Sequence, residues 1–103
     1  MRYKKGVDLS LREEITRIFP VIDLIYTKYG QDCVITCGFD GLHSKYSRHY
    51  LKIAIDVRTR YFTRSVAIKV AREIRAALKK LYGNNYNVLT HKTHIHIAYK
   101  PTR

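Results

Sequence analysis

The chain has no long apolar run. None of its stretches approaches the about 18 consecutive apolar residues that mark a membrane-spanning helix. The basic residues 1–5 are followed by no apolar segment with a small-residue cleavage site, so no signal peptide is recognised. We therefore expect a product made in the cytoplasm, or one that leaves it by a route without a cleaved signal.

Internal repeats and low-complexity tracts are also missing, and a length of 103 residues suits one domain spanning 1–103. Within it, residues 1–7 are expected to form a loose basic arm. The only cysteines, Cys33 and Cys37, lie in one expected strand, roughly 13 Å apart along it. That separation is too large for a disulfide. We interpret both as small buried hydrophobic residues, with a role as metal ligands as the alternative.

Acidic residues are scarce. Eight Asp and Glu stand against twenty Lys and Arg, which gives a net charge of +12. Such a surface associates with polyanions, whether nucleic acid, anionic lipid or the anionic polymers of a bacterial wall. No recognised nucleic-acid-binding motif occurs and the basic residues are dispersed, so a nucleic-acid partner is disfavoured.

Hydrophobic periodicity predicts an α+β fold with one antiparallel or mixed sheet covered by helices. A capping box at Ser10–Glu13 begins a first helix, Pro20 breaks or restarts it, and Gly30 stops the second helical pattern. The expected segments are helices at 10–19, 21–29 and 63–82 and strands at 33–37, 52–57, 86–91 and 94–100, the last two joined by a tight turn at 92–93.

The long helix at 63–82 is expected to pack an apolar stripe on the sheet, with a basic opposite face. The stripe consists of Ala67, Val70, Ala71, Ile74, Ala77, Leu78 and Leu81.

All five histidines fall in two neighbourhoods, around residues 43–49 and 91–96. Strand alternation separates Asp56 from the apolar Ile55 and Val57, so its carboxylate points away from the core. Likewise His94 and His96 share the strand face opposite Ile95 and Ile97. His49 cannot share the face of Asp56 on a straight strand, so it must reach the carboxylate from a loop or bend.

Two imidazoles and one carboxylate suit a catalytic zinc ion, which takes three protein ligands and leaves the fourth position open. The chain offers His49, Asp56 and His96 for this set. His94 lies about 7 Å from His96 along the same face, and we expect it to act beside the metal as a general acid and base.

The segment Ser47-x-His49-x-x-Lys52-x-Ala54-x-Asp56 resembles the S-x-H-x-x-G-x-A-x-D signature of the M15 zinc D-Ala-D-Ala carboxypeptidases and related phage endolysins. This resemblance implies a fold like that of the hedgehog and DD-peptidase domains. Lys52 replaces the glycine of the signature.

The pair His94-x-His96 is similar to the H-x-H element of the wider superfamily that joins lysostaphin-type enzymes, these peptidases and the hedgehog signalling domain. His43 also has a hedgehog counterpart. The resemblance implies zinc ligands at His49, Asp56 and His96, with His94 as the non-ligand histidine beside the metal.

The resemblance also implies a substrate site at Ser47 and Arg48. This chain departs from the family, however, at the position of the catalytic glutamate. Thr93 and Thr90 stand where family members carry that residue. The only glutamates, Glu13, Glu14 and Glu73, fall in expected helices. A general base would therefore have to be a histidine: His94, His91 or His43.

We therefore expect a zinc-dependent peptidase that hydrolyses peptide bonds of bacterial peptidoglycan, as a monomer that acts at the cell wall. Its partners would be wall peptides or anionic wall polymers. Two alternatives stay open: a non-catalytic zinc-binding interaction domain of the same fold, and a basic nucleic-acid-binding module.

Overall fold

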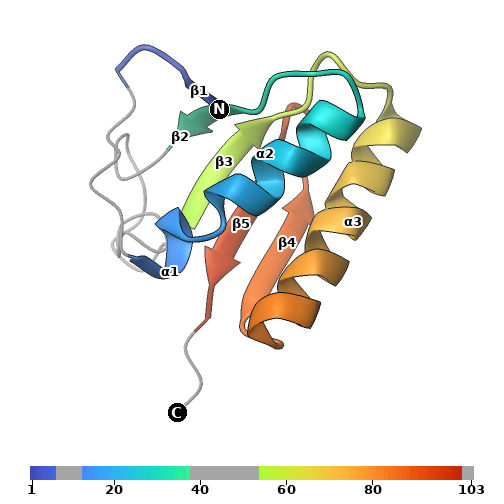
Figure 1. The fold of residues 1–103 in the computed structure, drawn as a ribbon. Coiled ribbons are helices and arrows are strands. Elements are labelled where there is room, and N and C mark those ends of the chain that lie inside the picture. The colour runs from blue at the N-terminus through green and yellow to red at the C-terminus, as the bar shows by residue number, and fades with distance from the viewer. Residues whose placement is uncertain (7–12, 38–53, 101–103) are drawn as a thin grey trace.

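A computed structural model describes residues 1–6, 13–37 and 54–100 (Figure 1). Its helices and strands follow one another as predicted, apart from an additional short strand at the N-terminus. They are β1 (Arg2–Tyr3), α1 (Glu13–Thr16), α2 (Phe19–Lys28), β2 (Val34–Cys37), β3 (Ala54–Arg58), α3 (Arg64–Tyr82), β4 (Tyr86–Thr90) and β5 (His94–Tyr99).

The five strands form one mixed sheet in the order β1-β2-β3-β5-β4. Only β1 and β2 run parallel, and the other neighbours are antiparallel. The two central strands, β3 and β5, are distant in sequence and pair over five residues of each. The α+β class with a helix-covered mixed sheet is thereby confirmed.

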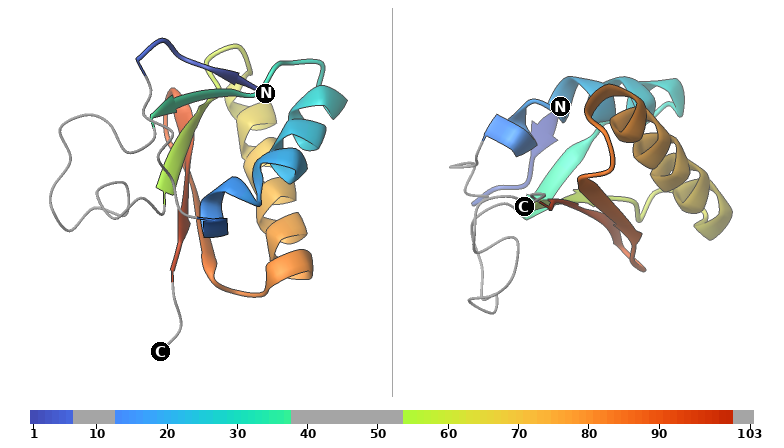
Figure 2. Two further views of the ribbon diagram at one scale, coloured as in Figure 1. Left: turned by 60° about the vertical axis from the view of Figure 1, so that its left-hand side comes forward. Right: turned by 90° about the horizontal axis from the view of Figure 1, so that it is seen from below.

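Helices α2 and α3 lie on one side of the sheet (Figure 2). Between the helices and the sheet is the core, to which β3 and β5 contribute Ile55, Val57, Ile95 and Ile97, all fully buried. Because side chains alternate along a strand, Asp56, His94 and His96 must point to the other side of the sheet. We call these three residues the histidine face.

Pro20 lies in the first turn of α2, where a missing backbone N–H costs no hydrogen bond. Of the two predicted effects of Pro20, a break or a restart of the helix, the structure shows a restart in α2. Gly30 follows the helix with φ +75°, a left-handed conformation that glycine adopts without strain. The predicted helix start at Ser10 lies outside the described residues.

Helix α3 begins where predicted, with Thr63 Oγ1 accepting a hydrogen bond from the Val66 N–H at 3.3 Å. Most of its apolar stripe is buried, but Leu81 is 57% exposed, so its assignment to the core was wrong. Near the end of the helix Tyr82 packs on the core instead. Its ring lies against Tyr86, with centroids 5.9 Å apart.

The N-terminal residues do not form the loose arm that we expected. Arg2 donates its backbone N–H to the Cys33 carbonyl at 2.7 Å, and Lys4 donates to the Ile35 carbonyl at 2.8 Å. These bonds add β1 to the edge of the sheet and fix Lys4 beside β2. None of the helices within the described residues is both long and apolar enough to cross a membrane.

Candidate metal centre

The centre of the histidine face is built by the pairing of β3 with β5. In their register Asp56 lies opposite His96 and Arg58 lies opposite His94. The flanking Ile55, Val57, Ile95 and Ile97 anchor both strands to the core. A slip of one residue would turn these aliphatic side chains out of the core, so hydrophobic burial fixes where the acid and the imidazoles meet.

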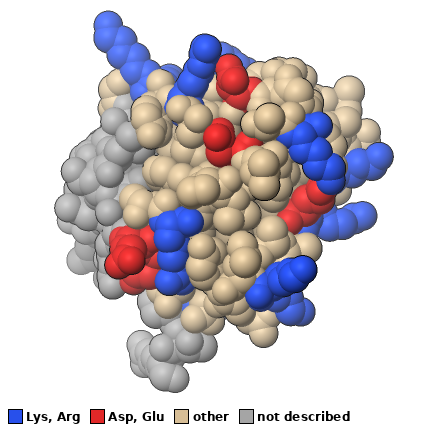
Figure 3. Space-filling view, viewed as in Figure 1, with Lys and Arg blue, Asp and Glu red and all other residues tan. Residues whose placement is uncertain are grey.

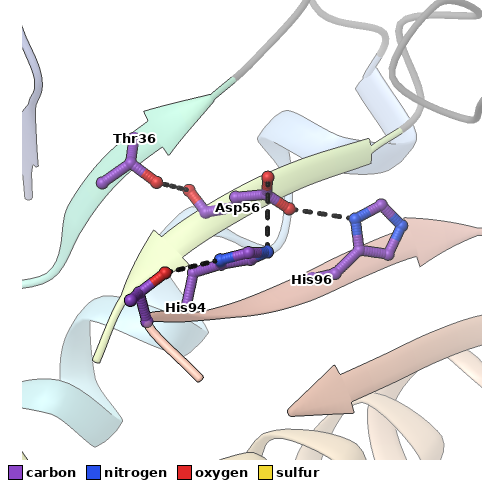
Figure 4. A network of polar contacts seen from close by, with 5 residues as sticks. Thr36, Asp56, His94 and His96 are labelled. Carbon is purple, nitrogen blue, oxygen red and sulfur yellow. Dashed lines mark hydrogen bonds and ion pairs between the residues drawn. The ribbon is translucent and has the colours of Figure 1, made fainter. Parts of the chain in front are cut away.

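Asp56 contacts both histidines (Figure 4). Its Oδ1 lies 2.9 Å from His96 Nδ1, and its Oδ2 lies 3.8 Å from His94 Nε2. The Asp56 side chain is only 14% exposed. A carboxylate this buried needs partners to offset the loss of hydration, and the two imidazoles supply them.

The imidazoles are themselves held by neighbours. Thr93 Oγ1 lies 3.2 Å from His94 Nδ1. The His91 ring stacks on His94 with centroids 4.7 Å apart, and its backbone N–H donates to the His94 carbonyl at 2.8 Å. The hairpin turn therefore brings the His91 ring next to both His94 and His96, with ring centroids 4.7 Å and 6.3 Å apart.

The donor atoms suit zinc in type. Two ligands at zinc's usual bond lengths in a tetrahedron are about 3.3 Å apart. The 2.9 Å between Asp56 Oδ1 and His96 Nδ1 is a hydrogen-bond distance, so the two atoms would have to separate by about 0.4 Å to share a zinc ion. An ionised carboxylate only accepts, so without metal the ring N–H donates to it, and a metal at this position would displace that proton.

Two of the three predicted ligands, Asp56 and His96, are therefore brought together. The third, His49, lies outside the described residues, as do His43, Ser47 and Arg48. Over residues 1–6, 13–37 and 54–100 no complete set of three metal-binding side chains is found. The described residues supply one carboxylate and imidazoles to the candidate site. A third ligand would have to come from another part of the chain.

No glutamate belongs to the centre. Glu13 and Glu14 are in α1, and Glu73 is in α3, where its carboxylate lies 2.6 Å from Lys28 Nζ. The expectation that all three are helical is confirmed. Within the described residues, the imidazoles nearest Asp56 are those of His94 and His96.

Cys33 lies in the core, as predicted, and takes no part in the centre. Burial raises the pKa of its thiol to about 12, so it stays protonated and is a poor metal ligand. The backbone of Cys37 belongs to β2, but its side chain is outside the described residues.

A hollow of about 370 Å³ adjoins the Asp56 and His94 side chains. Its other described lining residues are Lys4, Thr36, Arg58, Arg60 and Thr93. None of these five residues was predicted as a site residue from the sequence. Strand alternation could have indicated Arg58, two residues after Asp56, but Lys4 and Thr36 depend on how β1 and β2 join the sheet.

Comparison with known proteins assigns neither a family nor a function to this chain. No family model, curated protein or solved structure matches this chain.

Proposed function

We propose that the protein is a zinc-dependent peptidase that hydrolyses peptide bonds of bacterial peptidoglycan, of the D-Ala-D-Ala carboxypeptidase or endolysin type. One observation carries the proposal: Asp56 and His96, from two motifs 40 residues apart, lie side by side with donor atoms 2.9 Å apart. Asp56 and His96 were each predicted as a zinc ligand from a separate motif, and their contact supports both predictions.

In this proposal Asp56, His96 and His49 hold the zinc. When bound, zinc would acidify a water molecule and polarise the peptide carbonyl. Asp56 and His96 are fixed before any ligand arrives, because their strands are bonded across the sheet centre. Such preorganisation avoids the cost of arranging charged groups during the reaction.

His94 is proposed to carry the proton. Its Nε2 lies 3.8 Å from the Asp56 carboxylate, and its side chain is 31% exposed, so it is open to a ligand. His94 would take a proton from the attacking water and give it to the leaving amine. His91 stacks on His94 and would hold its ring in place, while His43 remains a candidate for the same proton transfer.

The proposed activity is tested by digesting purified peptidoglycan and a D-Ala-D-Ala-terminated muropeptide with the full chain. We expect cleavage that stops when a chelator is added and returns with zinc. His96→Ala should be inactive, and Leu24→Ala, which truncates an exposed side chain of α2 on the other side of the sheet (Figure 2), is the matched control. Full cleavage by His96→Ala, or no cleavage of any wall substrate by the zinc-loaded protein, would contradict the proposal.

A second candidate, a non-catalytic zinc-binding domain, is favoured by one observation: all three glutamates of the chain are on helices. Here the metal would stabilise the fold or an interface. Zinc binding without turnover, across a range of pH, would decide for this candidate.

The proposed partners are wall peptides and anionic wall polymers rather than nucleic acid. On the helix-covered face, the lysines and arginines that the structure describes are scattered among acidic residues and form no continuous basic stripe (Figure 3). Scattered positive charge concentrates a protein on polyanions in general, whereas nucleic-acid sites usually gather their cations on one face.

A further inference from the structure

The hollow beside the candidate metal centre collects positive charge from three separate parts of the chain. Lys4 follows β1, Arg58 ends β3, and Arg60 lies in the connection to α3. The only acid in its described lining is Asp56, whose two oxygens face the histidines. The hollow therefore has a positive balance where it adjoins the proposed reaction centre.

These cations have no acidic partner within the described part of the chain. Elsewhere in the same part, Arg2 pairs with Asp32 and Lys28 pairs with Glu73. By contrast, no carboxylate of residues 1–6, 13–37 or 54–100 forms an ion pair with Lys4, Arg58 or Arg60. Like charges gathered around one cavity repel each other, and an anion placed among them relieves that repulsion.

We infer that this hollow binds a carboxylate of the peptide substrate, through Lys4, Arg58 and Arg60. The inference rests on the proposed peptidase function. Guanidinium groups present paired N–H donors that match the two oxygens of a carboxylate. The volume of about 370 Å³ is within the range of small-molecule sites and admits the end of a peptide.

The position of the hollow favours the carboxylate of the C-terminal residue. The hollow shares Asp56 and His94 with the candidate metal centre. One residue of extended chain spans about 3.5 Å, so a carboxylate in the hollow leaves the preceding peptide bond near His94. The protein would then release single C-terminal residues, as a carboxypeptidase does, in preference to cutting inside a chain.

The test compares peptides that differ by one charge. Acetyl-Lys-D-Ala-D-Ala and its carboxamide are titrated into the full chain by calorimetry, with peptide integrity followed by mass spectrometry. We expect the acid to bind at least about tenfold more tightly than the amide. The preference should weaken at high salt, since ions screen partly exposed charges.

Two double variants assign the preference to the hollow. Arg58→Gln with Arg60→Gln should lower the acid-to-amide ratio several-fold, with Lys4 retaining part of the preference. The matched control, Lys69→Gln with Arg72→Gln, removes two exposed charges from α3 and should leave the ratio unchanged. Far-UV circular dichroism and thermal unfolding check that both variants fold. Equal affinity for acid and amide, or an unchanged ratio in the Arg58 and Arg60 variant, would overturn the inference.

A further peptide pair identifies the source of the carboxylate. It carries an internal glutamate or glutamine and ends in a carboxamide. Tighter binding of the acid-ended peptide alone assigns the C-terminal carboxylate, and tighter binding of the glutamate peptide assigns a side chain. Mass spectrometry detects cleavage of the peptides and so distinguishes the proposed peptidase activity from the proposed carboxylate subsite. A charge preference without cleavage supports the subsite and counts against the peptidase, whereas cleavage without a charge preference does the reverse.

Discussion

The two faces of the sheet use the same strands for opposite purposes. Toward the helices, β3 and β5 present four aliphatic side chains that are completely buried. Toward the other side, the intervening positions carry a carboxylate and two imidazoles that are only partly exposed. Successive side chains of one strand thus alternate between the core and the candidate site. The packing of the core side chains fixes the position of the site side chains.

The first prediction concerns the proton carrier on the histidine face. His94→Ala should lower the rate of peptide cleavage by about 10²–10⁴-fold, the usual contribution of a general acid or base. Its zinc content should hardly change, because the ring is not a proposed ligand. Its free energy of unfolding should fall by about 1 kcal/mol, since Asp56 loses one of its two imidazole partners. Cleavage kinetics, metal analysis and urea unfolding give the three readouts. Loss of zinc together with activity would make His94 a ligand and contradict the assigned role.

The second prediction concerns the core face. Ile97→Ala should lower the free energy of unfolding by about 2–5 kcal/mol, because the side chain is fully buried and its removal leaves a cavity. Leu89→Ala on the adjacent strand is the matched control. Leu89 is 44% exposed, and its truncation should change the unfolding free energy by about 0.5 kcal/mol or less. Similar losses in the two variants, measured by urea unfolding, would show that the faces are not divided as described.

The third prediction concerns a contact between helix α2 and the strand that carries Asp56. The buried Tyr26 hydroxyl donates to the Arg58 carbonyl at 2.8 Å. Tyr26→Phe should cost about 1–3 kcal/mol of unfolding free energy, because that carbonyl loses its donor. If the variant were as stable as the parent, this hydrogen bond would contribute nothing to joining the two layers.

The fourth and smallest effect is a pH dependence on the helix side. Hydrogen bonds from Lys28 and Tyr29 hold the pKa of the Glu73 carboxyl below its usual value. A depressed carboxyl pKa stabilises the fold above the unfolded-state pKa, and this stability is lost as the pH falls through the folded-state pKa. Parent protein and Glu73→Gln should therefore differ in unfolding free energy at pH 7 and converge in acid. A difference that persists unchanged at pH 2 would rule out the carboxylate as its origin.

Much of the fold followed from local patterns in the sequence. The 3.6-residue period of α3, Pro20 at the start of α2 and the alternation of Ile95 and Ile97 with the histidines each have a local physical cause. Leu81 was misplaced because periodicity does not reveal where a helix runs past the sheet. The strand at Arg2–Tyr3 was missed because β1 is defined by pairing with β2, a non-local contact.

The candidate site was predictable to a similar degree. Strand parity and the two motifs correctly brought Asp56 to His96, because both follow from alternation and register. The cationic hollow was not predictable, since Lys4, Arg58 and Arg60 meet only after β1 has joined the sheet. The role of His49 remains a prediction from the sequence, because that residue lies outside the described ranges.

The most direct test of the account is the zinc content of the purified protein and of Asp56→Asn and His96→Ala. We expect about one zinc per chain in the parent protein and almost none in either variant, with unfolding free energies close to that of the metal-free parent. His91→Ala is the control and should keep its zinc. A parent protein that binds no zinc, or variants that bind it as well as the parent does, would contradict the assignment of the histidine face as a metal centre.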